Sequence, residues 1–298
     1  MQLTKKYLFL YKMKKHLFYC LIILSGLSAC EEVPPYIDFT VPAVPLTDST
    51  YINPNVPAAQ HKAVLLEDIT GVRCQNCPAA ALKANDIVTQ KTEDSVVVVA
   101  LYPDIAAISN FTTPYSGVPR LTSEYSKQIT ETIKIPSGLP NGYVDRTIFA
   151  GRQDPVISPL DWINFVNERL KLKTPVNISI TKSIKDTTLK VKIKLEYNAS
   201  VNSGVNHKYS IFLIENGIVS SQLKPNGTDP NYVHNHALRY AFGNATGNAL
   251  TESLVAGRTF IKEFVYETPK SINLANCHIV CLVSDASTNE VINVRQIH

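Results

Sequence analysis

Two cysteines three positions apart, Cys74 and Cys77, are the residues of this chain best suited to chemistry. They stand where an apolar run at 63–69 gives way to a helix-like stretch at 78–84. Cysteines at this spacing can close a small disulfide, and a sulfur at the positive end of a helix is favoured as the thiolate. The pair could exchange disulfides with a partner, or serve as a permanent disulfide that pins the start of the helix.

The elements that must position this pair alternate between strand and helix. Strands are predicted at 63–69, 95–102 and 142–149, and helices at 77–91, 121–132 and 159–171. The run at 95–102 is rich in valine, which is typical of a strand buried on both faces. Strands separated by helices predict an α/β layer.

The sequence changes character at residues 174–175, after which apolar and polar residues alternate. The alternating or apolar runs lie at 176–181, 189–197, 207–214, 232–241, 258–266, 278–283 and 290–296. Several period-two strands punctuated by turn residues predict an antiparallel β-sandwich. The chain after residue 60 exceeds the usual size of one domain, so we expect two, at 61–174 and 175–298.

Two segments of the first half resemble thioredoxin-like proteins. The stretch 65–84 is similar to their strand, Cys-x-x-Cys and helix, and the stretch 138–146 is similar to their loop in which a cis-proline faces the cysteines. The fold class expected from this resemblance is a thioredoxin-like α/β domain followed by the antiparallel β-sandwich. The resemblance also implies that the Leu139–Pro140 bond is cis, and cis bonds are tolerable only before proline.

The same resemblance implies catalytic roles for four residues. Cys74 would attack a partner disulfide and Cys77 would resolve the mixed disulfide. The backbone of Pro140 would pair with an extended partner peptide, and Asp68 would be the buried acid that assists proton transfer. Arg73, beside the first cysteine, would help to lower the pKa of its thiol.

The N-terminus reads as a targeting segment. Basic residues precede an apolar core at 17–24, and Leu27-Ser28-Ala29-Cys30 resembles a bacterial lipobox. We expect residues 1–29 to be a lipoprotein signal peptide and Cys30 to be lipidated, which makes the membrane a partner through that lipid. The proline-rich residues 30–60 would form a tether.

Charge argues against nucleic acid as a partner. The whole chain has 29 basic and 25 acidic residues, but five of the lysines lie in the predicted signal peptide, which contains no acid. The mature chain therefore has 24 basic and 25 acidic residues, and no basic patch interleaved with aromatic residues is evident. We find no glycine-rich phosphate loop or serine-nucleophile elbow, and we predict no cofactor.

Two further groups of residues are candidate sites. His234 and His236 would face the same side of a strand and could bind a metal or a peptide, but no third metal ligand follows from the sequence, and no metal site is predicted. Cys277 and Cys281 lie about 13 Å apart on a strand, too far to pair, and are expected to be free and buried.

A wider resemblance covers most of the chain. The segments 67–78 and 232–239 are similar to signatures of the outer membrane protein 28 family of Bacteroidetes lipoproteins. This resemblance implies a protein of the outer membrane, facing the periplasm or the cell surface. Two functions are then open: thiol–disulfide exchange on an extracytoplasmic protein or peptide partner, or non-catalytic surface binding or adhesion with a structural Cys74–Cys77 disulfide.

Overall fold

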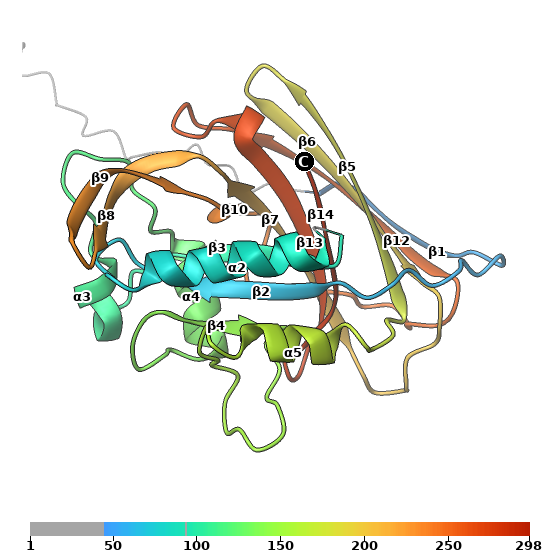
Figure 1. The fold of residues 1–298 in the computed structure, drawn as a ribbon. Coiled ribbons are helices and arrows are strands. Elements are labelled where there is room, and N and C mark those ends of the chain that lie inside the picture. Colours follow the sequence, from blue (N-terminus) through green and yellow to red (C-terminus); the bar gives the residue numbers. More distant parts are fainter. Residues whose placement is uncertain (1–44, 93) are drawn as a thin grey trace, which may run out of the picture. The chain divides into compact units, whose positions relative to one another are not determined.

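In the computed structural model, which describes residues 45–92 and 94–298, two apolar runs form the centre of a sheet. Val64–Ile69 (β2) and Val96–Leu101 (β3) pair in parallel, and all their side chains are buried. Helix α2, Cys77–Lys91, connects them and covers one face of the strands (Figure 1). Its small residues Ala80 and Ala84 pack against that face. These elements lie within two residues of their predicted bounds.

Strand β4, Asn141–Val144, runs antiparallel to β2 along its free edge. The Leu139–Pro140 peptide bond just before it is cis, as the thioredoxin resemblance implies. The strand predicted at 142–149 ends early because Asp145 and Arg146 adopt left-handed φ angles of 50° and 55°, which turn the chain out of the sheet.

Two further helices cover opposite faces of these strands. Helix α5, Trp162–Arg169, lies on the same face as α2, and the Trp162 side chain is fully buried there. Helix α4, Glu124–Ile133, lies on the other face (Figure 1). Its Ile129 side chain is buried in the core on that face. The Ser123 side chain caps α4 by accepting a hydrogen bond from a backbone N–H of its first turn.

Strands from the second half of the chain continue the same sheet, in the order β14-β13-β7-β10-β3-β2-β4, with β11 paired to β7. Their bounds are His207–Glu215 (β7), Ala237–Ala241 (β10), Asn248–Ala249 (β11), Cys277–Asp285 (β13) and Val291–Ile297 (β14). Strand β10 lies parallel to β3 and antiparallel to β7. The sheet therefore crosses the domain boundary expected at residues 174–175, and the division into two domains stays a prediction.

A second sheet has four antiparallel strands in the order β1-β12-β6-β5. Their bounds are Pro45–Ile52 (β1), Val176–Lys185 (β5), Thr188–Tyr197 (β6) and Arg258–Glu267 (β12). A large core of aliphatic and aromatic residues lies between this sheet and strands β7, β10 and β13. The β-rich second half is thus confirmed, while residues 45–52 of the expected tether instead form an edge strand, whose first position tolerates proline.

A separate hairpin is formed by β8, Ile218–Lys224, and β9, Gly227–His234. The single strand predicted at 232–241 is in fact the end of β9 and all of β10, because His236 between them has a left-handed φ of 57°. The remaining short elements are Ala106–Ile108 (η1), Ser109–Thr112 (α3) and Leu274–Asn276 (η2).

Buried charges join the two halves of the chain. One Asp145 carboxylate oxygen lies 2.8 Å from both the Lys62 Nζ and the Arg169 Nε atoms, and the other accepts a hydrogen bond from Leu65 N. Arg169 also reaches Glu290, just before β14, at 2.7 Å. Every charge in the cluster has a partner of opposite sign, which offsets the cost of its burial.

The predicted signal peptide and Cys30 lie outside the described residues. Within the described residues, none of the helices has the length and apolar character needed to cross a bilayer.

Candidate functional site

The cysteine pair is closed as a disulfide. The Cys74 and Cys77 sulfurs are 2.10 Å apart and their Cα atoms 5.4 Å apart. Cys77 is the first residue of α2, and Cys74 lies in the turn before it. Each residue is only 2% exposed. Thiol–disulfide exchange requires an incoming thiolate to reach a sulfur, and this burial opposes such access.

The loop that contains α3 holds one side of the turn before α2. The Arg73 backbone N–H donates to Phe111 O at 2.8 Å, and its side-chain Nε donates to Thr113 O at 2.8 Å. The Arg73 guanidinium lies 4.2 Å from the centre of the Tyr115 ring. A Cβ atom on Gly71 would lie 2.3 Å from Phe111 O, so this close approach requires glycine. Arg73, expected to activate a thiol, is thus engaged by the loop.

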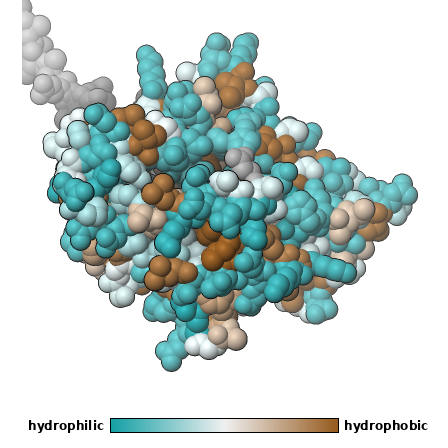
Figure 2. Space-filling view, viewed as in Figure 1, coloured by the Kyte–Doolittle hydropathy of each residue, from teal (hydrophilic) through white to brown (hydrophobic). Residues whose placement is uncertain are grey.

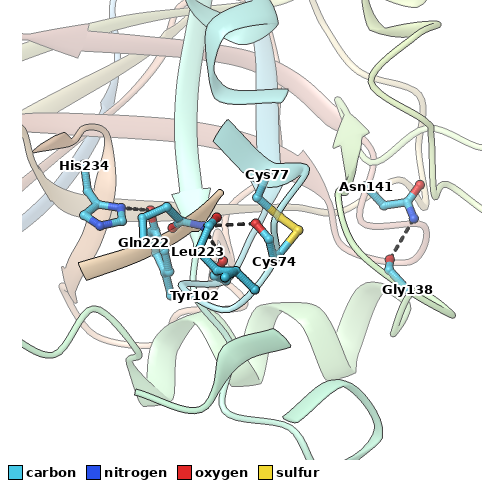
Figure 3. Close-up of a disulfide and its surroundings, with 9 residues drawn as sticks. Cys74, Cys77, Tyr102, Gly138, Asn141, Gln222, Leu223 and His234 are labelled. Atoms are coloured by element: carbon cyan, nitrogen blue, oxygen red, sulfur yellow. Dashed lines mark hydrogen bonds between the residues drawn. A yellow bond between two sulfur atoms is a disulfide. The ribbon is translucent and has the colours of Figure 1, made fainter. Parts of the chain in front are cut away.

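The β8–β9 hairpin holds the other side of the turn. Leu223 N donates to Val72 O at 2.8 Å. The buried Gln222 amide donates from Nε2 to Cys74 O at 3.0 Å and to Gly71 O at 3.3 Å (Figure 3). The cysteine turn is therefore clamped between two segments that follow it by about 40 and 150 residues in the sequence.

The proline loop reaches the same end of the sheet as the disulfide. Asn141 pairs with Ile69, the last residue of β2, so Pro140 lies where the chain leaves β2 towards Cys74. In Figure 3, Gly138 and Asn141 lie on the side of the disulfide opposite Gln222, and the Asn141 amide donates to Gly138 O at 2.8 Å. The role of Pro140 in pairing with a partner peptide stays a prediction.

Asp68 is a buried acid, as the resemblance implies. It is 3% exposed, and its Oδ1 atom has no hydrogen-bond partner among the described residues. Burial raises the pKa of this carboxyl to about 7, because the apolar surroundings disfavour its charged form. Its neighbour Glu67 has the opposite environment and is paired with Arg146 through two hydrogen bonds of 2.8 and 2.6 Å.

His234, the last residue of β9, is buried and fully hydrogen-bonded. Its Nε2 lies 3.2 Å from Ser220 O, which can only accept, so Nε2 carries the proton. Its Nδ1 then accepts from the Tyr102 hydroxyl at 3.0 Å. Burial lowers the pKa of His234 to about 4, so the ring is neutral at physiological pH.

His236 does not share a regular strand with His234, because the strand breaks between them. Its backbone N–H donates to the Asn216 side chain at 2.7 Å, and its carbonyl accepts from Ala100 N at 2.8 Å, which joins β10 to β3. In the part of the chain that the structure describes, no three His, Cys, Asp or Glu side chains are grouped to hold a metal ion.

A cavity of about 360 Å³ lies between α2 and the β8–β9 hairpin. It brings Asp68 together with one cysteine of the pair and both histidines. The lining residues used below are Asp68, Leu82, Tyr102, Tyr232, Val233 and His234. Sequence reasoning missed Tyr102, Tyr232 and Gln222. Tyr232 and Gln222 belong to the hairpin, which was not predicted, and Tyr102 directly follows β3 and contacts the hairpin through His234.

The family profile described as "Outer membrane protein Omp28" matches residues 126–298, more than half of the chain. The chain belongs to this family. The matched residues include β4, the hairpin and the second half of the chain, but not the cysteine pair. Membership of the Omp28 family makes this chain an outer membrane protein.

Two solved structures from Porphyromonas gingivalis resemble the chain. "HBP35" has 16% sequence identity and a TM-score of 0.62 over 81% of this chain and 76% of that one. A domain of the outer membrane lipoprotein Omp28 has 20% identity and a TM-score of 0.29 over 42% of this chain and 87% of that one. The first of these likenesses concerns the fold alone. No curated protein matches the sequence.

The other two cysteines of the described chain are free and buried, as predicted. Cys281 lies in the core between the two sheets, and burial raises the pKa of its thiol. Burial also raises the pKa of the Cys277 thiol, to about 12. Neither thiol is ionised at neutral pH, so neither is a ready nucleophile.

Proposed function

We propose that this member of the Omp28 family is a non-catalytic binding protein of the outer membrane, built on a thioredoxin-like fold, in which Cys74–Cys77 is a structural disulfide. The observation that carries the proposal is the 2% exposure of each cysteine within a turn clamped from two sides. A disulfide that must be unclamped before a thiol can reach it is suited to holding structure.

The arrangement of the first half supports the thioredoxin-like part of the proposal. Parallel β2 and β3 are joined by α2, the cysteine pair stands at the start of that helix, and antiparallel β4 follows a cis-proline. On this proposal the chain keeps a thioredoxin-like fold. The β8–β9 hairpin is an addition to that fold, which covers the cysteines and forms one wall of the cavity.

Reduction in the native state tests the structural disulfide. When Cys20, Cys30, Cys277 and Cys281 are all replaced by alanine, only the clamped pair can react with a thiol-labelling maleimide after treatment with dithiothreitol. We expect no labelling in native buffer and two labels in urea. Rapid labelling of the folded protein at low reductant would overturn the proposal. The Gln222→Ala variant, which loosens the clamp, should be labelled sooner than the parent.

The anchor and the partner are the remaining parts of the proposal. Lipid on Cys30 would hold the chain to the membrane, with an extracytoplasmic protein or peptide as its partner. The lipobox that ends at Cys30 supports this anchor. The Cys30→Ser variant should lose metabolic incorporation of palmitate and leave the outer membrane fraction. A variant that kept both its label and its location would contradict lipid anchoring at this residue.

Thiol–disulfide exchange is a second candidate function, favoured by the unpartnered and readily protonated Asp68 carboxyl. The Cys74 thiolate would attack a partner disulfide, forming a mixed disulfide and releasing one partner thiolate. Cys77 would pass its proton to Asp68 and attack Cys74, releasing the second partner thiolate. The partner disulfide is reduced to two thiols and the pair is oxidised to a disulfide.

A trapping experiment separates the two functions. The Cys77→Ser variant cannot resolve a mixed disulfide, so an exchange protein would accumulate covalent complexes through Cys74 in the cell envelope. The structural disulfide predicts no such complexes. The Cys74→Ser/Cys77→Ser double variant controls for adducts formed elsewhere.

A further inference from the structure

The cavity between α2 and the hairpin has an acid at its floor. Asp68 is almost fully buried, and one of its oxygens has no hydrogen-bond partner among the described residues. An unsatisfied buried polar atom is costly, and such atoms in native proteins call for an explanation. The volume of about 360 Å³ suits a small ligand or a single long side chain.

Aromatic rings stand beside this acid. Tyr102, which directly follows β3, and Tyr232 and His234 on β9 line the cavity. The His234 ring centre is 4.7 Å from that of Tyr232 and 5.8 Å from that of Tyr102. The negative faces of aromatic rings attract cations, most strongly where water is excluded. Aromatic rings next to a carboxylate can therefore bind a positively charged group together.

The exposed residues that line the cavity are two apolar side chains, Leu82 and Val233, and two amides, Asn85 and Asn235. Leu82 on α2 is 65% exposed and Val233 on β9 is 49% exposed, and both belong to the lining. The face shown in Figure 2, which carries α2 and the hairpin, has hydrophobic residues set among hydrophilic ones. The described lining contains no lysine or arginine, so neither of these cations pairs with the Asp68 carboxyl from within the cavity.

We propose that this cavity binds a primary ammonium group on a short apolar stem, with Asp68 as its counter-ion. The ammonium would donate to the unpartnered Oδ1 atom and lie against the tyrosine rings, while the stem would contact Leu82 and Val233. This assignment deepens the binding function proposed above and rests on it, but it does not depend on whether the disulfide can be reduced.

Binding should release a proton below neutral pH. The titratable groups that line the cavity with Asp68 are Tyr102 just after β3, Tyr232 and His234 on β9, and His236 after β9. Helix α2 contributes no ionisable side chain to the described lining. Burial keeps His234 and both tyrosines neutral, because it lowers the pKa of the histidine and raises those of the phenols. Asp68, with a pKa of about 7, must lose its proton to pair with the ammonium.

Titration calorimetry on the full folded chain tests the proposal with three probes that share one stem. Phenethylamine should bind, 2-phenylethanol should bind at least about 10-fold more weakly, and 3-phenylpropionate should not bind. At pH 6, measurements in two buffers with different ionisation enthalpies should reveal the release of close to one proton, and at pH 8 almost none. Equal binding of amine and alcohol, or preference for the acid, would overturn the assignment.

Substitutions in and near the cavity test whether phenethylamine binds there. Asp68→Asn should weaken phenethylamine binding about 10- to 100-fold, and Ala81→Phe should block the cavity while leaving the acid in place. Asp86→Asn removes an exposed carboxylate of the same helix and should leave binding unchanged. If Asp68→Asn and Ala81→Phe both fold and bind phenethylamine as tightly as the parent, this cavity is not the site.

A fourth probe distinguishes two sources of the ammonium group. N-acetyl-lysine methylamide carries it on the stem of a peptide side chain. Its binding would identify a lysine of a protein partner as an occupant, whereas binding of phenethylamine alone would identify small amines. Failure of every amine would overturn the cavity assignment, while the labelling of Cys74 and Cys77 would still decide the role of the disulfide.

Discussion

Glu67 and Asp68 are neighbours on one strand and almost equally buried, at 0% and 3% exposure, yet their surroundings differ completely. Glu67 is gripped by the Arg146 guanidinium through two hydrogen bonds. Asp68 faces a cavity with one oxygen unpartnered. Successive side chains of a strand point to opposite faces, so one backbone supplies a closed structural contact and an open site within two residues.

The comparison shows that two almost equally buried carboxyl groups can serve different purposes. A buried carboxylate with a matched cation is fixed and stays charged, and removing its partner is costly. A buried carboxyl without a cation keeps its proton up to neutral pH and remains available to a ligand or a proton donor. Four variants test this contrast and the site around it, from the largest expected effect to the smallest.

Breaking the buried ion pair between Glu67 and Arg146 should lower the free energy of unfolding most. Arg146→Ala leaves Glu67 buried without its cation and should lower the free energy of unfolding by about 3–5 kcal/mol, measured by urea denaturation. The double variant Glu67→Gln/Arg146→Ala removes the stranded charge and should regain part of that loss. A loss below about 1 kcal/mol for the single variant would show that the pair is not desolvated.

Replacing Asp68, on the side of β2 that faces the cavity, should raise the free energy of unfolding rather than lower it. The pKa of Asp68 is raised from about 3.8 to about 7, so the folded state holds this proton more tightly than the unfolded chain does. The stability that Asp68 contributes is complete below pH 4 and is lost as the pH rises through 7. Asp68→Asn should therefore be more stable than the parent by about 3–4 kcal/mol at pH 8 and no more stable at pH 3.5.

Denaturation curves across this pH range provide the measurement. Asp86→Asn, on the exposed side of α2, is the matched control and should follow the parent at every pH. A difference between Asp68→Asn and the parent that did not change with pH would mean that Asp68 ionises normally in the folded chain.

Removing the disulfide should have a moderate effect. Cys74 and Cys77 close a loop of only about four residues, which corresponds to about 2 kcal/mol of chain entropy in the unfolded state. Cys74→Ala/Cys77→Ala should therefore unfold at lower urea than the oxidised parent, by about that free energy. Reductant should leave the variant unchanged, and a variant as stable as the parent would argue against a stabilising disulfide.

Removing the Gln222 side chain, which clamps the cysteine turn, should lower the free energy of unfolding least. Gln222→Ala loses the hydrogen bonds to Gly71 O and Cys74 O and should lower the free energy of unfolding by about 1 kcal/mol. The disulfide should also become easier to reduce in the folded protein. Gln75→Ala, an exposed change in the same turn, should alter neither property.

Part of this site could be predicted because its signals are local. The valine run of β3, the cysteine spacing and the helix from Cys77 to Lys91 each depend on residues close together in the sequence, and the structure has these elements nearly where they were expected. The cis bond before Pro140 follows from the resemblance of a short segment.

The cavity could not be predicted, because one of its walls comes from about 150 residues further along the chain. The Asn226-Gly227 pair that joins β8 to β9 is a turn signal, but β8 has no clear alternation and β9 contains Pro230. No local pattern indicates that this hairpin lies over the cysteine turn. The pairing of β10 with β3 could not be predicted from the sequence either, because it depends on the left-handed turn at His236.

The position of β10 between β3 and β7 determines how this protein can be dissected. A fragment ending near residue 174 would leave the backbone of β3 without its partner strand, and a fragment starting there would do the same to β10. Unpaired edges of this kind recruit strands from other molecules and lead to aggregation. Single substitutions in the intact chain, rather than separately expressed halves, are therefore the route to assigning its activities.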